Sequence, residues 1–200
     1  MRHVGALTIL LGALGACAIA MPPTEYDMPL VAVNRPTDVE NRWGPYELQL
    51  VDTSYTYEDQ LMQVAFVPSD GTFWFRLQNK SEHSIQLVWD EMAYVGPSGL
   101  SSGVASGETR MMDVGQSRPP SVVPPGASLV DLAIPTTHLV RGLYGHTILD
   151  FVPADSSAGG YEGKEIRLTF PVRVRETVNE YTFVFTLKNV RRPTPPARDS

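Results

Sequence analysis

Cysteine is nearly absent from this chain of 200 residues, in which Cys17 is the only one. An intramolecular disulfide is therefore excluded, and we expect the fold to be stabilised by its apolar core alone. Long basic runs are also missing, and the formal net charge is −6. This acidic balance argues against a nucleic-acid partner and against electrostatic docking to anionic lipid.

The residue patterns of common catalytic and metal sites are missing as well. His138 and His146 stand eight residues apart, which is no recognisable ligand spacing, and no further cysteine is there to complete a zinc site. The stretch 96–100 has its glycines at the wrong offsets for a nucleophile elbow. Asp90 and Glu91 are adjacent on an expected strand, so their side chains should point to opposite faces rather than act together on one bond. We therefore predict no catalytic residue, no metal and no cofactor.

The N-terminus is typical of an export signal. Met1, Arg2 and His3 form a short positive head, and Val4–Leu14 follow without a charge. Eleven residues in a helix rise about 16 Å, roughly half of a bilayer core of about 30 Å, so this run cannot remain as a membrane span. No second apolar segment of spanning length follows it in the sequence.

The end of this signal carries the order Leu14, Gly15, Ala16, Cys17, which resembles the lipobox of bacterial lipoproteins. The resemblance implies that residues 1–16 are removed and that Cys17 receives a diacylglycerol thioether and, usually, an acyl group on its new amine. Cysteine suits this role because its thiolate is readily alkylated near neutral pH. Two or three acyl chains give stable anchoring, since each buried methylene contributes about 0.8 kcal/mol. A plain secretory peptide with an incidental cysteine is the alternative.

The residues after the cysteine bear on its destination. Ala18 and Ile19 follow Cys17, and no aspartate does. By the same resemblance, this favours the outer membrane, with the protein facing the periplasm or the cell surface, over retention at the inner membrane.

The rest of the chain divides by composition into a tether, one domain and a tail. Residues 17–43 contain four prolines and few periodic apolar positions, and we expect them to be a flexible tether with a root-mean-square span of about 25 to 30 Å. Residues 44–190 form the predicted domain. Residues 191–200 are proline-rich and polar, and should be disordered.

Alternation with period two dominates the domain and predicts strands. The clearest case lies at the C-terminus, where two alternating runs match as an antiparallel hairpin if residues 176–179 form the turn. In that register Val174 lies opposite Tyr181, and Phe170 lies opposite Phe185. Pro171 lacks a ladder donor, which places its strand at a sheet edge or at a bulge.

Other strands are expected at 46–52, 61–67, 73–80, 85–91, 93–95, 109–114, 128–134 and 147–151, without a long amphipathic helix. This pattern predicts an all-β fold, an antiparallel β-sandwich of immunoglobulin-like or fibronectin-like type, with a partly closed barrel as the alternative. The runs 79–95 and 122–129 are loosely similar to small sandwich domains of the water-stress and hypersensitive-response type. That similarity covers too little of the chain to assign site residues.

Two regions are candidates for binding. In the expected register, the outward face of the C-terminal hairpin carries a basic stripe that could dock an acidic partner or a polysaccharide. The stripe consists of Arg167, Arg173, Arg175 and Lys188. The alternative is that these charges lie on a solvent-exposed face and prevent the sheet edge from pairing with another chain. Trp74, elsewhere in the domain, is a candidate exposed aromatic residue of a binding surface. The loop-rich segment 96–126 is the first site candidate, because loops on a rigid sandwich usually carry binding.

These observations favour a non-enzymatic envelope lipoprotein whose sandwich binds or scaffolds another envelope component, either a protein or a glycan. A structural accessory subunit of a larger assembly is a related possibility. A lipid-tethered, hydrolase-like enzyme is the alternative from another class, and it would need convergent polar residues that the sequence does not display.

Overall fold

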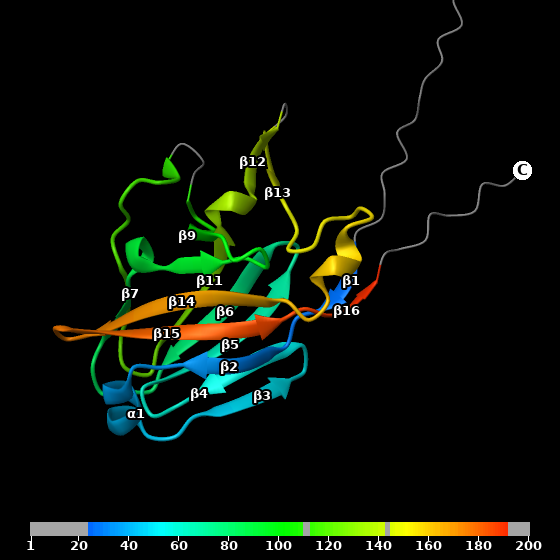
Figure 1. Ribbon diagram of the computed structural model, residues 1–200. Helices are drawn as coiled ribbons and strands as arrows, with labels where there is room; N and C mark the ends of the chain where they lie inside the picture. The colour runs from blue at the N-terminus through cyan, green and yellow to red at the C-terminus, as the bar shows by residue number, and fades with distance from the viewer. Residues whose placement is uncertain (1–23, 110–112, 143–144, 192–200) are drawn as a thin grey trace, which may run out of the picture.

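The computed structural model describes residues 24–109, 113–142 and 145–191, which form an all-β antiparallel fold (Figure 1). The lipobox residues Leu14, Gly15, Ala16 and Cys17, and the tail from residue 192 onward, lie outside the described residues. Among the described residues, no helix has both the length and the apolar character needed to cross a membrane.

The strands form two facing sheets. The first is built on the long hairpin, and comprises β2 (Leu30–Asn34), β15 (Thr177–Thr186), β14 (Glu165–Val174), β7 (Ile85–Leu87), β8 (Ala93–Val95) and β10 (Ser121–Val123). The second is a meander extended by one further strand, and comprises β3 (Glu47–Val51), β4 (Ser54–Glu58), β5 (Met62–Ser69), β6 (Thr72–Asn79) and β11 (Ser128–Pro135).

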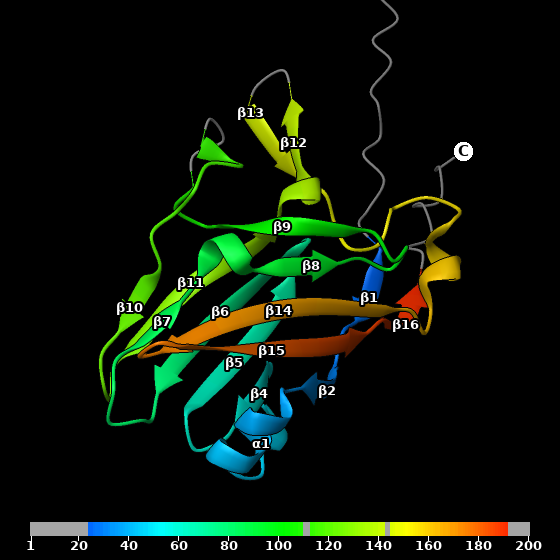
Figure 2. The same cartoon turned by 60° about the vertical axis from the view of Figure 1, so that its left-hand side comes forward.

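Strand β9 (Ser101–Ser106) joins the two sheets along one side (Figure 2). Its first half pairs with β8, where Gly103 lies opposite Ala93, and its second half pairs with β11, where Ala105 lies opposite Ile134. The sandwich is therefore nearly closed along this side. The expected all-β antiparallel sandwich is confirmed, and its partial closure combines features of both expected architectures.

Smaller elements lie at the ends of the sandwich. β1 (Glu25–Asp27) pairs with β16 (Lys188–Arg191), so both ends of the described chain meet at one place. The hairpin of β12 (Leu139–Gly142) and β13 (Gly145–Ile148) projects from the body in both views (Figures 1 and 2). Short helices complete the fold: α1 (Thr37–Trp43) and the 3-10 turns η1 (Trp89–Glu91), η3 (Thr136–His138) and η4 (Ala158–Tyr161).

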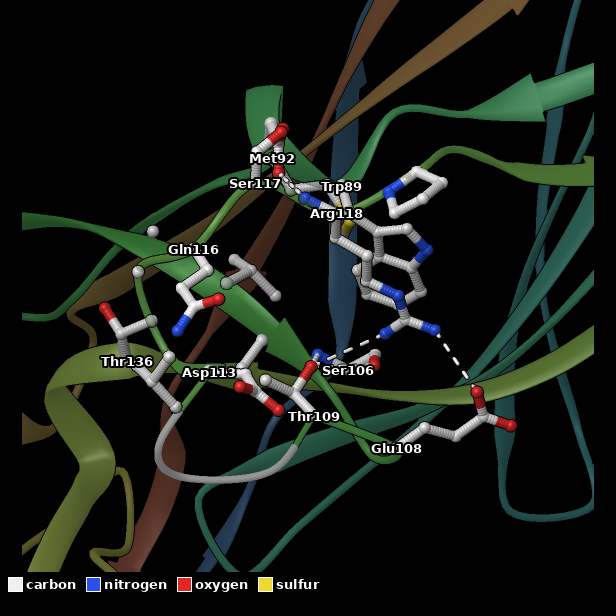
Figure 3. A pocket seen from close by; sticks show the side chains of 17 residues that line it. Trp89, Met92, Ser106, Glu108, Thr109, Asp113, Gln116, Ser117, Arg118 and Thr136 are labelled. Carbon is white, nitrogen blue, oxygen red and sulfur yellow. Dashed lines mark hydrogen bonds and ion pairs between the residues drawn. The ribbon is translucent and has the colours of Figure 1, made fainter.

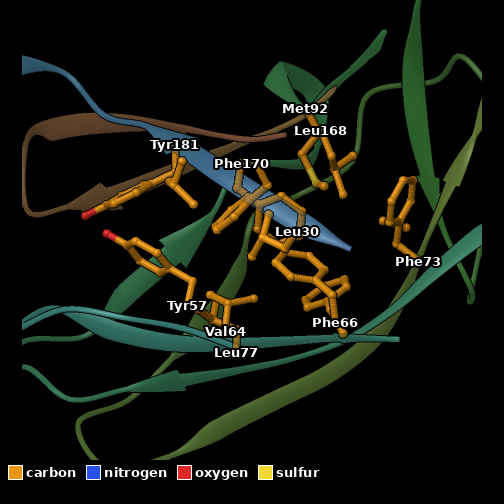
Figure 4. Packing of buried hydrophobic residues seen from close by; sticks show 14 of the residues in the cluster. Leu30, Tyr57, Val64, Phe66, Phe73, Leu77, Met92, Leu168, Phe170 and Tyr181 are labelled. Carbon is orange, nitrogen blue, oxygen red and sulfur yellow. The ribbon is translucent and has the colours of Figure 1, made fainter. Parts of the chain in front are cut away.

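Aromatic side chains from both sheets fill the space between them (Figure 4). Phe66 of β5 meets three phenylalanines of the opposite sheet in edge-to-face geometry, with ring centroids 4.7 to 5.5 Å apart: Phe170, Phe183 and Phe185. Such pairs stabilise a core beyond the apolar area that they bury. Since no disulfide is available, this aromatic layer and the pairing of β9 with both sheets hold the sandwich together.

The C-terminal hairpin is present, but its expected register is wrong. Phe170 lies opposite Tyr181, and Val172 lies opposite Asn179. The turn has only two residues, Arg175 and Glu176, and Arg175 has a φ of 53°. Because the shift involves an even number of residues, the apolar side chains that were expected to face inward still face the core.

Pro171 does not lie at a sheet edge or at a bulge of its ladder, contrary to the expectation. Its strand β14 pairs with β15 on one side and with β7 and β8 on the other. The carbonyl of Pro171 accepts a hydrogen bond from the backbone N–H of Val88 at 3.0 Å, in the gap between β7 and β8. The N–H and C=O of one strand residue point to the same side, so the missing donor faces the interruption between two short strands.

Residues 24–43 belong to the folded domain, so the expected tether is wrong over this range. β2 pairs with β15 of the long C-terminal hairpin, on the side away from β14, with Val33 opposite Phe183. Leu30, Val33 and Val39 are buried, and Leu30 points among the core rings in Figure 4. Their spacing does not repeat long enough to be recognised as a strand or a helix from sequence. The domain therefore already includes residue 24, the first described residue, and does not start at residue 44.

A buried ion pair fixes this N-terminal segment. The Arg35 guanidinium lies 3.5 Å from the Asp59 carboxylate, and their side chains are 4% and 0% exposed. Asp59 also accepts hydrogen bonds from the backbone N–H groups of Leu61 and Met62 and from the Tyr57 hydroxyl at 2.6 Å. The Tyr57 pKa is raised, first by burial and then by the neighbouring Asp59 carboxylate. Asp59 thus supplies both the negative charge that Arg35 needs and the acceptors that the neighbouring N–H and O–H groups need, which no apolar residue could do.

Several local predictions also need correction. The run 85–91 breaks after β7, because Trp89–Glu91 form a 3-10 turn. The expected strand 109–114 is not formed by its described residues, and residues 110–112 lie outside the described part. The expected strand 147–151 ends at Ile148. Strands β1, β2, β4, β9, β10, β12 and β16 have too few alternating apolar positions to be recognised.

The Asp59→Ala substitution should lower the free energy of unfolding by about 3–5 kcal/mol, because it leaves the buried Arg35 charge without its counterion. Chemical denaturation of the purified protein measures this change. Asp38→Ala is the matched control, since the Asp38–Arg42 pair has the same 3.5 Å separation but is solvent-exposed, and it should cost less than about 1 kcal/mol. Equal effects of the two substitutions would contradict a special role for the buried pair.

Gly71→Ala should destabilise the fold more than Gly99→Ala. Both glycines have positive φ values, 74° and 81°, so alanine costs about 1–2 kcal/mol at either position. A Cβ atom at residue 71 would also overlap the carbonyl of Leu149, whereas none of the described atoms lies within 4 Å of a Cβ at residue 99. We expect overpacking to add about 1–3 kcal/mol at Gly71 alone. Equal losses in parallel denaturation curves would contradict this close packing.

Candidate functional site

A polar cavity lies on one side of the sandwich, between β9, η1 and the segment 113–119 (Figure 3). Its volume is about 650 Å³. Much of its lining comes from the loop-rich segment that the sequence marked as the first site candidate; the polar side chains that face it include Ser106, Thr109, Asp113, Gln116 and Arg118. Its position agrees with that prediction, and its ligand remains a prediction.

Arg118 forms one wall of this cavity. Its guanidinium carbon lies 4.7 Å from the centre of the Trp89 ring. The same group lies 3.4 Å from the Glu108 carboxylate and 3.9 Å from that of Asp131, and donates to the Thr109 hydroxyl at 3.5 Å. The buried Trp89 therefore acts as a platform that holds a partly exposed cation at the cavity wall.

Asp90 connects η1 to the far side of the cavity. Its carboxylate accepts hydrogen bonds from the Ser117 hydroxyl and, at 2.8 Å, from the backbone N–H of Arg118. The Ser117 hydroxyl, followed by the Arg118 N–H, holds the pKa of Asp90 below its ordinary value. Glu91 turns instead toward Arg173, 3.8 Å away. The two adjacent acids thus diverge, although they lie on a 3-10 turn rather than on the expected strand, and Asp90 orders a loop.

The cavity chemistry suits hydrogen bonding and charge recognition. Hydroxyl, amide, carboxylate and guanidinium groups converge on it, and no histidine is among its described lining residues. Within the described ranges, no group of three His, Cys, Asp or Glu side chains is arranged to hold a metal ion. The arrangement can therefore bind a polar ligand through side chains of this chain alone.

Trp74 lies on the outer face of the second sheet, in an apolar row. It stands opposite Val67 on β5 and opposite Leu132 on β11, so their side chains share that face. Val130 is the next residue on the same face of β11, two positions before Leu132. Its exposed fraction is 53%, and that of Trp74 is 37%. Outward positions on a solvated sheet are usually polar, so an apolar row here marks a candidate contact surface. We call Val67, Trp74, Val130 and Leu132 the Trp74 surface.

The four basic residues of the expected stripe do not form one. Arg167 lies on β14, 3.3 Å from the Glu165 carboxylate, and Arg173 lies near Glu91. Arg175 occupies the hairpin turn, where its guanidinium is 2.8 Å from the His83 ring. Lys188 lies beyond the hairpin, on β16. The expected turn was too long, so the residues after it were assigned to the wrong positions, and acidic neighbours neutralise two of the charges.

The second cavity is a groove of about 600 Å³ that begins at Thr24, where the described chain starts. Its lining is mainly apolar or aromatic, including Tyr94, Leu100, Ile148, Leu149 and Phe151. We call it the Thr24 groove. The lining comes from five stretches that are separate in the sequence, namely 24, 94–100, 137–138, 148–154 and 161. No sequence pattern brings them together, so sequence reasoning missed the groove.

His138 is the one histidine in the described lining of the Thr24 groove. Its Nδ1 lies 2.9 Å from the Gly71 carbonyl, and its ring contacts Tyr94 and Phe151 with centroids 5.2 and 5.3 Å away. Burial lowers the His138 pKa, with the Gly71 carbonyl and the Asp150 charge opposing this shift. The imidazole is therefore neutral at pH 7 and behaves as an aromatic lining group.

No family model matches this chain, and comparison with curated proteins and with solved structures finds no match either. The functional argument therefore depends on the residues and on their arrangement.

Proposed function

We propose that this protein is a lipid-anchored lipoprotein of the bacterial envelope whose β-sandwich binds or scaffolds another envelope protein without catalysing a reaction. The observation that carries the proposal is the Leu14–Cys17 box at the end of an apolar run too short to span a bilayer. The acyl chains on Cys17 would supply membrane attachment, and the absence of an aspartate after the cysteine favours the outer membrane.

The Trp74 surface is the proposed contact for the partner. It combines an exposed indole with neighbouring apolar side chains on a rigid sheet, and Arg76 lies beside it, opposite Val130. Trp and Arg are the residues most enriched at the energetic centres of protein interfaces. A partner with an apolar patch bordered by a carboxylate would complement this surface.

Cys17→Ser should abolish anchoring, because a hydroxyl is a far weaker nucleophile than the thiolate that accepts the diacylglycerol group. We expect the variant to be lost from the membrane fraction or to accumulate with its signal uncleaved. Fractionation of cells and the electrophoretic mobility of the product measure both outcomes. Ala18→Ser is the matched control and should be processed and retained. Normal maturation and membrane retention of Cys17→Ser would refute the lipoprotein proposal.

A photoreactive amino acid at Val130 should crosslink to an envelope protein in intact cells, and Trp74→Ala should reduce the yield of that adduct several-fold. The matched control position is Arg167, which is equally accessible but lies on the other sheet. Denaturing electrophoresis and mass spectrometry identify the adducts. An adduct from Arg167 alone would move the contact to the opposite sheet, and the absence of adducts from both positions would contradict the binding proposal.

A further inference from the structure

The proposed anchor lies close to the folded domain. Only six residues, 18–23, separate Cys17 from Thr24, where the described fold begins. The seven Cα-to-Cα steps from Cys17 to Thr24 span at most about 25 Å when fully extended. The proposed anchor therefore holds Thr24 within that distance of the bilayer, and the end of the fold that carries Thr24 would face the membrane.

Thr24 is fixed at this end of the molecule. Its hydroxyl donates to the Pro153 carbonyl at 2.9 Å, and its residue is 5% exposed. The next residues form β1, which pairs with β16. The Tyr26 hydroxyl of β1 donates to the Asp150 carboxylate, which also accepts the Phe151 N–H at 2.7 Å. These contacts attach the chain entry rigidly to the segment that forms one wall of the Thr24 groove.

The mouth of the Thr24 groove is apolar and exposed. Leu100 is 73% exposed, Leu149 is 48% exposed and Ile148 is 40% exposed, and all three line the groove. Leu100 comes from the turn after β8, and Ile148 and Leu149 come from the base of the β12–β13 hairpin, where β13 returns to the body of the fold. Exposed leucine and isoleucine side chains that cluster at one end of a soluble domain mark an interaction surface.

We propose that the Thr24 groove is a lipid-docking surface, with Leu100, Ile148 and Leu149 inserted at the boundary between the headgroups and acyl chains of the anchoring bilayer. This inference depends on the lipid anchor proposed above and specifies how the domain is oriented on it. The argument for lipid as the occupant is the short connection, which starts at the bilayer and ends within the groove. A single anchor concentrates the domain at the surface, so weak apolar contacts suffice to dock it.

The charges beside the groove do not oppose docking. The Asp150 carboxylate is held by Tyr26 and by the Phe151 N–H, and the imidazole of His138 is directed to the Gly71 carbonyl. The Tyr94 hydroxyl is buried and has no hydrogen-bond partner among the described residues. The ester carbonyl of a phospholipid is a hydrogen-bond acceptor, and it lies at the depth where Leu100 and Leu149 would insert, so it could accept from the Tyr94 hydroxyl. Docking would then depend on apolar contacts and neutral hydrogen bonds rather than on ion pairs, and should not require anionic lipid.

Site-specific fluorescence in vesicles tests this orientation. Acylation consumes the Cys17 thiol, so a cysteine introduced by Leu149→Cys is the only thiol that a maleimide dye can label. The mature lipoprotein is reconstituted into phosphatidylcholine vesicles, and the dye is exposed to aqueous iodide or to a lipid that carries a quencher high on its acyl chain. The control position is Val122→Cys, 58% exposed on β10, which lies across the molecule from β1 (Figure 2).

We expect the lipid-borne quencher to reduce emission at residue 149 several-fold more than at residue 122, and iodide to do the reverse. Leu100→Asp in the Leu149→Cys background should reverse both effects, because it places a carboxylate in the apolar mouth. Raising the salt concentration to about 0.5 M should leave the wild-type pattern unchanged, since screening weakens only ionic contacts.

Other results would overturn the inference. Equal iodide quenching at both positions in protein that floats with the vesicles would refute docking while leaving the anchor intact. Protection from iodide without lipid quenching would place residues 18–23, or at high protein density a second copy of the chain, in the groove instead. Failure of the protein to float with vesicles would contradict the proposed anchor itself, and is measured before any fluorescence.

Discussion

The ion pair between Arg35 and Asp59 holds the N-terminal segment 24–43 in the folded domain. Both side chains are almost completely buried, so each charge depends on the other to compensate for lost hydration. The Asp59 carboxylate also accepts hydrogen bonds from the Tyr57 hydroxyl and from backbone N–H groups, and the Arg35 guanidinium donates to the Gly44 carbonyl. Arg35 follows β2, whereas Asp59 lies between β4 and β5 in the opposite sheet. The pair therefore holds β2 and α1 against the sandwich, and converts a segment with the composition of a linker into part of the fold.

This constraint has a consequence for the proposed anchor. A tether of 27 residues would have allowed the domain to sample any orientation above the membrane, whereas a connection of six residues, 18–23, restricts both its distance and its orientation. Under the proposed anchor, the end defined by β1 and β16 would face the bilayer. The Trp74 surface lies on the outer face of the second sheet rather than at that end.

The sequence allowed the class of fold to be predicted because alternation is a strong signal when a strand is long and one of its faces is buried. β6, β14 and β15 have this property, and the expected all-β sandwich followed from them. Alternation determines the face but not the register, since a shift by two positions preserves every inward residue. Asn179 illustrates the limit: it was expected in a turn, yet it is buried and donates to the Val172 carbonyl at 3.1 Å. Short strands such as β1 and β10 are formed through pairing with distant strands, and three residues are too few to show an alternating pattern in the sequence.

The candidate sites were predicted less completely for a related reason. The loop-rich segment was recognised from its composition, and a cavity lies there, but the Thr24 groove is assembled from segments that are far apart in the chain. Trp74 was recognised as an outward aromatic residue, whereas its apolar neighbours Val67 and Leu132 come from strands whose pairing the sequence did not specify.

Mass spectrometry of the mature protein isolated from envelopes tests the central claim most directly. The account predicts an N-terminal Cys17 that carries a diacylglycerol thioether and is followed by the unmodified sequence through Thr24. An N-terminus that retains residues 1–16, or that carries Cys17 with a free thiol, would contradict it.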